Sequence, residues 1–261
     1  MSLMSRTLLR RMSSHAWQPP RLLLLAFLGC LTFNGAALAD EPSKEFWPEV
    51  DMWMRLNPEW RVSVFLPISK NIETDYREGN IIAQVDYAWS KPDIFYMVRL
   101  LDENRAQEMK AFLVRGGYLG GRSLDDRGQA YTEHTIFAEL HTRIPLTGRV
   151  LMSHRGRTDF RWLGDSNPDF SYRLRYRLMI EKEFEAGGTS IVPYVNAEPY
   201  YDSRYSTVNR IRLVGGATIA WTPFFALEAN ITYQHDTRSS VTNLYALNVI
   251  LHLFFVTDTA S

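Results

Sequence analysis

Arginines at alternate positions are the residues of this chain whose types and spacing suggest chemistry. Arg173, Arg175 and Arg177 are separated by single large apolar residues within the segment 170–184. Because side chains alternate between the two faces of a β-strand, these three guanidinium groups share one face and the apolar residues share the other. A guanidinium group binds carboxylates and other oxyanions through paired hydrogen bonds. The spacing therefore predicts a strand with a cationic face suited to anions or to buried ion pairs.

The same segment is longer than an ordinary strand. A globular strand runs about five to six residues, whereas the alternation here continues from Phe170 to Ile180. Long strands with one apolar and one polar face are typical of barrels that cross a membrane, with lipid outside and a polar lumen inside. We therefore predict an all-β fold, a transmembrane antiparallel up-and-down β-barrel of about twelve strands. The competing interpretation is a secreted soluble β-sandwich or lipocalin-like barrel, which also alternates.

The beginning of the chain has the pattern of an export signal. A basic lead is followed by an apolar run at 22–28 and by Ala37-Leu38-Ala39, the small-x-small pattern of a signal-peptidase site. We predict a signal peptide at 1–39, cleaved after Ala39, a barrel at 40–255 and a short tail at 256–261. The predicted location is the outer membrane of a Gram-negative bacterium. A lipoprotein site at Cys30 and a twin-arginine signal at Arg10-Arg11 are the weaker interpretations.

Composition restricts the function classes. Cys30 is the single cysteine and leaves with the signal, so the mature chain has no disulfide, thiolate metal site or cysteine nucleophile. After cleavage 25 basic and 29 acidic residues remain, a balance that argues against a nucleic-acid partner. Of those basic residues 20 are arginine, a bias that favours buried or lumenal ion pairs. We predict no cofactor. The predicted partners are outer-membrane lipid and lipopolysaccharide, the barrel-insertion machinery and small anionic solutes.

The strand count leaves one conflict. Twelve strands are traced at 50–56, 60–66, 81–89, 94–101, 109–119, 133–144, 149–157, 170–184, 190–201, 209–221, 224–234 and 242–255. Counting back from the last strand places the tight turns near residues 57 and 90 outside, and the longer 67–80 segment in the periplasm. Bacterial barrels normally keep their short turns inside, so ten strands is the alternative count. Pro193, Pro199 and the pair Gly215-Gly216 are expected to mark bulges, bends or strand ends.

Several motifs resemble a family of Gram-negative outer-membrane barrels without an assigned function (domain of unknown function twenty-four-ninety). The resemblance covers about 45–255 and implies a barrel, with no known activity, ligand or catalytic residue. It is carried by Phe46-Trp47-Pro48-Glu49, Arg155-Gly156-Arg157 with Arg161, the segment 172–177, and the segment 193–198.

The predicted lumen has two interpretations. In the first, an arginine track makes a narrow channel that favours anionic solutes. In the second, the arginines pair with glutamates and leave a plugged, purely structural or interaction barrel. Twelve strands lie between the filled eight-stranded barrels and the open sixteen-stranded ones, so size does not decide. The track comprises Arg143, Arg155, Arg157, Arg173, Arg175, Arg177, Arg210 and Arg212, and the counter-charges are Glu139, Glu181, Glu198 and Glu228.

An outer-membrane lipid hydrolase is the alternative from a different class. Ser153 and His154 are adjacent and so face opposite sides of a strand, which prevents them from acting together as nucleophile and base. No set of nucleophile, base and orienting group can be assembled, so we predict no catalytic residue and no enzyme.

Glu139 and His141 share a face, but two ligands do not make a metal site. We expect the tryptophans near strand ends to form interfacial girdles: Trp47, Trp53, Trp60, Trp89, Trp162 and Trp221.

Overall fold

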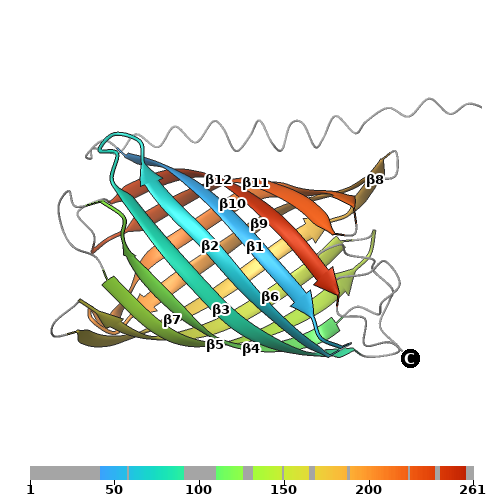
Figure 1. Cartoon of the computed structure of the whole chain (residues 1–261), viewed down its shortest axis with the longest axis horizontal. Coiled ribbons are helices and arrows are strands. Elements are labelled where there is room, and N and C mark those ends of the chain that lie inside the picture. Colours follow the sequence, from blue (N-terminus) through green and yellow to red (C-terminus); the bar gives the residue numbers. More distant parts are fainter. Residues whose placement is uncertain are drawn as a thin grey trace, which may run out of the picture. The chain divides into compact units, whose positions relative to one another are not determined.

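The computed structural model describes residues 42–57, 59–90, 110–125, 132–148, 150–164, 168–186, 189–222, 224–238 and 242–256. These residues lie in one compact unit, an all-β barrel (Figure 1). The predicted signal peptide, the predicted strand at 94–101 and the tail beyond residue 256 lie outside the described residues. No helix in the described part of the chain is long and apolar enough to cross a membrane.

The described residues form twelve strands, which overlap eleven of the twelve segments traced in the sequence and are mostly longer than them. They are β1 (Ser43–Arg55), β2 (Trp60–Asn71), β3 (Arg77–Ser90), β4 (Lys110–Ser123), β5 (Thr132–Leu146), β6 (Val150–Leu163), β7 (Asp169–Lys182), β8 (Phe184–Ala186), β9 (Thr189–Asp202), β10 (Thr207–Thr222), β11 (Phe225–Asp236) and β12 (Asn243–Val256).

Eleven of these strands close the barrel, and β8 is an extra short strand. The order runs β1 to β7, then β9 to β12, and β12 pairs with β1. This closing pair is parallel, with Ser43 opposite Leu244 and Arg55 opposite Val256, whereas all other pairs are antiparallel. The prediction of an all-β barrel of about twelve strands is confirmed. An even number of alternating strands would pair in antiparallel fashion throughout. An odd number must close with one parallel pair, and here that pair is β1 with β12.

Pro193 accounts for the separate β8. Glu181 pairs with Tyr194 and Phe184 pairs with Ile191, so Pro193 lies opposite Lys182, the last residue of β7, where the pairing with β9 is interrupted. Proline has no N–H to donate to a ladder. The expectation that Pro193 marks an irregularity is confirmed, and β8 continues the path of β7 along β9.

The odd count moves the turn near residue 57 to the same end as the other tight turns, and the connection 91–109 between β3 and β4 joins that end too. Short connections at 56–59, 147–149, 187–188 and 223–224 all lie at one end of the barrel, on the right in Figure 1, which we call the short-turn end. The connections at 72–76, 124–131, 164–168, 203–206 and 237–242 lie at the opposite, wide-loop end. The discrepancy arose from a strand placed at 94–101. Since β3 pairs directly with β4, no strand lies between them in the sheet.

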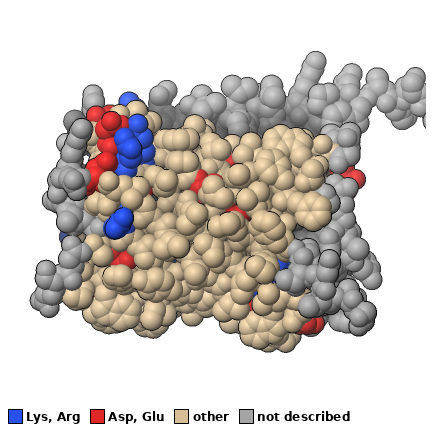
Figure 2. Space-filling view, in the orientation of Figure 1, with Lys and Arg blue, Asp and Glu red and all other residues tan. Residues whose placement is uncertain are grey.

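The inner and outer faces alternate along each strand as the sequence predicts. In β7, Phe170, Tyr172, Leu174 and Tyr176 are exposed on the outer face, while Ser171 and Glu181 are buried inside. Residues other than Lys, Arg, Asp and Glu cover most of the middle of the outer face seen in Figure 2, and charged residues gather at its left, wide-loop end. Hydrophobic burial therefore does not hold this fold together from within, because its largest apolar surface points outward.

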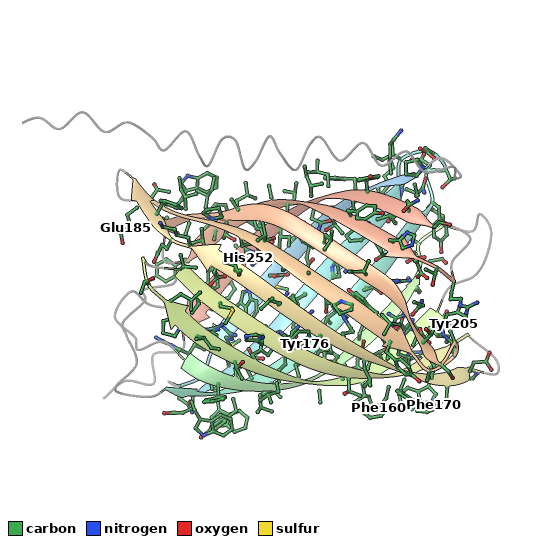
Figure 3. The ribbon with its side chains drawn as sticks, turned by 180° about the vertical axis from the view of Figure 1, so that it is seen from behind. Phe160, Phe170, Tyr176, Glu185, Tyr205 and His252 are labelled. Carbon is green, nitrogen blue, oxygen red and sulfur yellow. The ribbon has the colours of Figure 1, made fainter. Side chains whose placement is uncertain are left out.

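Aromatic side chains gather at both ends of the outer face. At the short-turn end, Trp60 packs on Tyr87 with ring centroids 4.8 Å apart, and Trp221 stacks on Phe225 at 5.4 Å. At the wide-loop end the pairs include Trp162 with Phe170 at 5.4 Å, and Figure 3 shows Phe170 and Phe160 near that end. The girdle prediction holds for Trp60, Trp89, Trp162 and Trp221, which lie on the outer face near strand ends.

The girdle prediction is wrong for Trp47 and Trp53, which point into the barrel. Trp53 packs against the buried Phe254, and the Arg61 guanidinium lies 4.3 Å from the centre of its ring. Arg212 lies over the ring of Trp47. Both tryptophans occupy odd positions of β1, the same face as the buried Asp51, so strand parity rather than nearness to a strand end decides their side.

Pro199 interrupts the ladder between β7 and β9. Arg175 pairs with Tyr200 and Leu178 with Ala197, but Tyr176 and Arg177, which lie opposite Pro199 and Glu198, are not paired. The missing N–H of proline explains the gap. The strand itself continues, so the expected irregularity lies in the hydrogen bonding and not in the strand's course.

The expected bulge at Gly215-Gly216 is absent. Both glycines keep a regular register with β9 and β11, and the irregularities of β10 lie at Val208/Arg210 and Ala220/Thr222 instead. Gly216 is needed for a close approach: a Cβ placed there would lie 2.3 Å from Asn230 Cβ and 2.5 Å from the Ala229 carbonyl oxygen. At Gly215 the nearest atom would be 4.0 Å away.

This contrast gives a matched pair of substitutions on neighbouring residues. Gly216→Ala is expected to lower the free energy of unfolding by about 1–3 kcal/mol, because it overpacks the wall of the lumen. Gly215→Ala is expected to be neutral or to stabilise by up to about 1 kcal/mol, since it only restricts the unfolded chain. Urea titration of the protein in lipid vesicles measures both. Equal effects of the two substitutions would contradict the close approach.

Candidate functional site

All eight arginines of the predicted track lie on the inner face of the barrel. Arg143 lies on β5, Arg155 and Arg157 on β6, three further arginines on β7, and two on β10. Their strands are consecutive around one side of the barrel, separated only by β9. The barrel wall therefore brings the arginines to a single interior surface, as the alternation predicts.

Glu139 is the centre of the lumenal network. Its carboxylate accepts hydrogen bonds from Arg115 Nη1 at 3.1 Å and from Arg157 Nη1 at 2.9 Å, and Arg155 Nη1 lies 3.6 Å from it. His141 Nε2 lies 2.7 Å from Glu139 Oε2. One carboxylate thus holds guanidinium groups from β4 and β6 together.

Arg115 extends this network to Asp86 on β3. Its Nε donates to Asp86 Oδ1 at 2.6 Å, and Arg61 Nη2 donates to Asp86 Oδ2 at 2.6 Å. The Asp86 and Glu139 side chains are only 2 % and 1 % exposed. A buried pair remains stable only when its hydrogen bonds are satisfied, and here Arg115 donates to both carboxylates at once.

Glu198 plays the same part on the opposite side of β7. Arg155 Nη2 donates to Glu198 Oε1 at 2.6 Å, and Arg175 Nε donates to the same oxygen at 2.9 Å. Tyr200 donates its hydroxyl to Oε2 at 3.1 Å, and the Arg175 guanidinium lies 4.7 Å from the centre of the Tyr200 ring. Arg155 therefore bridges Glu139 and Glu198 and makes one continuous network.

A second group of ion pairs lies at the wide-loop end. Asp202 accepts from Arg173 Nη2 at 3.2 Å and from Arg204 Nη2 at 2.8 Å, and Arg161 Nη1 lies 3.5 Å from it. Arg210 pairs with Asp236 at 2.7 Å. Arg204 belongs to the turn after β9, where its hydrogen bond to Asp202 raises the pKa of its guanidinium.

Glu228 behaves differently from Glu139 and Glu198. Among the described residues it contacts no arginine at ion-pair distance; it accepts from the Tyr194 hydroxyl, and His252 Nε2 lies 3.3 Å from Glu228 Oε2. Glu181 is buried on the inner face of β7. The expected pairing of Glu228 with the track is not found in the described residues, because Glu228 lies opposite Thr218 on β10, several positions from Arg210 and Arg212.

Arg177 and Arg212 stand apart from the paired arginines. Arg212 donates to the neutral Gln234 amide oxygen at 2.7 Å and lies over the rings of Trp47 and Tyr200. Arg177 forms no hydrogen bond or ion pair with any part of the chain that the structure describes. Neither Arg177 nor Arg212 has a carboxylate within ion-pair distance among the described residues.

Apolar side chains fill the lumen next to the short-turn end. Leu113, Leu151, Ala226 and Phe254 all point inward, and their exposures do not exceed 4 %. Trp53 packs against the same cluster. The interior thus changes from charged to apolar along the barrel.

Sequence reasoning missed the arginines and aspartate of the first strands. Arg61, Asp86 and Arg115 complete the central network, yet four glycines weaken the alternation of β4, which carries Arg115. A signal was present: Gln84 and Asp86 alternate with Ala83 and Val85. No group of three or more His, Cys, Asp or Glu that fits a metal ion occurs among the described residues.

Removal of the Glu139 charge tests the network. Glu139→Gln is expected to lower the free energy of unfolding by about 3–5 kcal/mol, because it leaves buried guanidinium groups without compensation. Glu73→Gln, which breaks a 3.9 Å pair with Lys44 at the surface, is the control and is expected to cost less than about 1 kcal/mol. Urea titration in vesicles compares them. A loss at Glu139 no larger than the control would show that the network does not stabilise the barrel.

Comparison with known proteins supplies a family but no activity. Among curated proteins, none matches this chain. A solved structure described as a bacterial polysaccharide outer membrane secretin is similar to it, with 10% sequence identity, a TM-score of 0.43 and coverage of 76% of this chain and 64% of the other. The model of a protein family of unknown function, DUF2490, matches residues 45–245. The chain therefore belongs to the DUF2490 family.

Proposed function

We propose that this protein is an outer-membrane β-barrel whose lumen is sealed in its resting state by a network of buried ion pairs. The observation that carries the proposal is the low exposure of charged lumenal side chains. The Arg115 and Arg157 side chains are 9 % exposed, and their carboxylate partners Asp86 and Glu139 are 1–2 % exposed. In a water-filled pore of porin type these groups would be accessible to water.

The outer face supports insertion in a membrane. Outward side chains such as Ile136, Leu140, Val195 and Ile231 are more than half exposed, which is unfavourable in water but suits lipid. Aromatic pairs occupy both ends of this face, where girdles sit in barrels of this kind. We assign the short-turn end to the periplasm, because bacterial barrels place short turns there.

The number of strands leaves room for a sealed lumen. Barrels of eight strands are filled by side chains, and those of sixteen or more contain an aqueous channel. A barrel of eleven strands lies between these sizes, so the length of the inward side chains decides whether the lumen is filled or open. Here the charged network fills the middle, and the apolar cluster around Phe254 and Leu151 fills the short-turn end.

A narrow channel for anionic solutes is the second candidate. It is favoured by Arg177 and Arg212, which lack a carboxylate partner among the described residues and would favour anions over cations. In this candidate the network opens to allow passage. Replacement of Arg173, Arg175 and Arg177 together by Ser would then lower the anion preference.

A lipid hydrolase finds less support. His154 and His134 lie on the outer face, and their Nδ1 atoms contact the hydroxyls of Tyr176 and Tyr118 at 2.6 and 2.5 Å. Ser153 lies on the inner face, as strand parity requires. A hydrolase requires a nucleophile close to its base, and these contacts are with tyrosine.

Single-channel recording in a planar bilayer tests the seal. The wild-type protein is expected to insert and remain silent, whereas Arg115→Ala combined with Arg155→Ala is expected to give stable conductance steps, because two inward guanidinium groups that link carboxylates on different strands are removed. Arg122→Ala, on the outer face of β4, is the matched control and is expected to remain silent. Stable steps in the wild type with an anion-side reversal potential would reject the seal in favour of the channel.

Quenching by brominated lipid tests the membrane assignment. A variant that retains only Trp89 is expected to be quenched strongly in brominated vesicles, because this side chain is 47 % exposed on the outer face. A variant that retains only Trp53, which points inward against Phe254, is expected to be quenched weakly. Equal, weak quenching of both would count against a membrane barrel.

A further inference from the structure

Arg177 lies opposite another arginine in the wall of the lumen. Its direct cross-strand neighbour on β6 is Arg155, and like charges directly opposite each other are unfavourable. The other charged groups that interact with it are Glu198, Glu139 and Arg175. Both carboxylates are already engaged by other guanidinium groups. Arg177 is therefore a cation beside a cation, and it forms no hydrogen bond with the described residues.

Arg155 contributes an unsatisfied donor at the same place. Its Nη atoms are directed at Glu139 and Glu198, but its Nε is buried and has no acceptor. A buried donor without a partner costs about 1–3 kcal/mol, and each such group in a native structure calls for an explanation. A bound acceptor is one such explanation.

Asn196 adds a neutral polar group beside Arg177. It lies on the inner face of β9 and pairs with Met179, two residues beyond Arg177 on β7. Its side chain forms no hydrogen bond with any described residue, and both it and Arg177 are half-buried rather than sealed. An amide and a guanidinium group therefore occupy neighbouring inward positions of the wall, where each can donate hydrogen bonds into the lumen.

The surrounding charges do not balance. The ion pairs of the central network join the guanidinium groups of Arg61, Arg115, Arg155, Arg157 and Arg175 to the carboxylates of Asp86, Glu139, Asp159 and Glu198, and Arg177 lies beside them without an ion pair to a described residue. Cations therefore exceed anions in a region that is largely shielded from water. Excess buried charge is costly unless a counter-ion compensates it.

We infer that a small oxyanion binds in the lumen between Arg177, the Nε of Arg155 and the side-chain amide of Asn196. Sulfate and phosphate present the acceptor oxygens that these donors lack, and their double charge opposes the excess of guanidinium groups. The ladder is open at this position because of Pro199, so the site lies where the wall is least constrained. The same chemistry is offered by a free inorganic ion and by a sulfate, phosphate or carboxylate group carried on a sugar. The inference depends on the barrel interior, and it holds whether or not the lumen conducts.

Isothermal titration of the detergent-solubilised protein with sodium sulfate and with sodium phosphate tests the site. We expect one ion bound per barrel in the wild type. Arg177→Gln is expected to weaken binding about ten- to a hundredfold, the loss of a charge-assisted hydrogen bond. Arg210→Gln, which removes a lumenal arginine already paired with Asp236, is the matched control and is expected to retain the affinity. Absence of sulfate and phosphate binding in the wild type, or unchanged binding in Arg177→Gln, overturns the inference.

The free energy of unfolding gives a second test, in which Arg177→Gln and Arg175→Gln are expected to have opposite effects. In chloride buffer, Arg177→Gln is expected to be at least as stable as the wild type, because it removes the charge repulsion between Arg177 and Arg155. Arg175→Gln is expected to unfold more readily, because it removes the ion pair between Arg175 and Glu198. Marked destabilisation by Arg177→Gln in chloride would mean that Arg177 has a partner within the protein, and would overturn the site.

Titration with glucose 6-phosphate and with glucuronate distinguishes the sources. Tighter binding of a sugar-borne group than of inorganic phosphate supports the site with a carbohydrate ligand, and the reverse order supports it with a free ion. In either case Arg177→Gln must weaken the tighter ligand for the inference to stand.

Discussion

The sharing of each buried carboxylate between two or more guanidinium groups is the interaction on which the inside of this barrel depends. Asp86, Glu139, Glu198 and Asp202 each hold arginines from different strands. Lysine could not replace these arginines well, because an ammonium group is a point charge whereas the planar guanidinium donates in two directions at once. The excess of arginine over lysine in the chain is therefore a consequence of building an interior from ion pairs.

Closure of the sheet makes this interior possible. A barrel leaves no free strand edge, so every strand contributes one face to the lumen and one to the surroundings. Eleven strands close through a parallel pair between β1 and β12 that extends over the whole of β1. Prolines lie where the ladders are interrupted, and each interruption is local. Pro193 separates β8 from β7, and Pro199 leaves Tyr176 and Arg177 unpaired without ending β9.

The charge pattern and the seal come from the same residues. The arginines that suggest an anion track are, with the exceptions of Arg177 and Arg212, engaged with acids or with groups near them, and their low exposure is what supports a sealed lumen. Function in such a barrel would depend on which charges remain uncompensated. The excess of positive charge is greatest around Arg155 and Arg177, which lie opposite each other on β6 and β7, and it does not extend along the whole arginine track.

The sequence by itself determined the faces of the strands. Alternation in 170–180 and in the later strands predicted which side chains point inward, because side-chain direction follows from strand parity alone. Tertiary structure decided the rest. The count of eleven required knowing that β3 pairs with β4, and the role of Gly216 required knowing how closely Asn230 approaches it. The partners of the arginines could not be predicted either, since register and curvature bring Asp86, Arg115 and Glu139 together from three strands. Parity is a local property of the chain, whereas pairing across a closed barrel depends on distances between residues far apart in sequence.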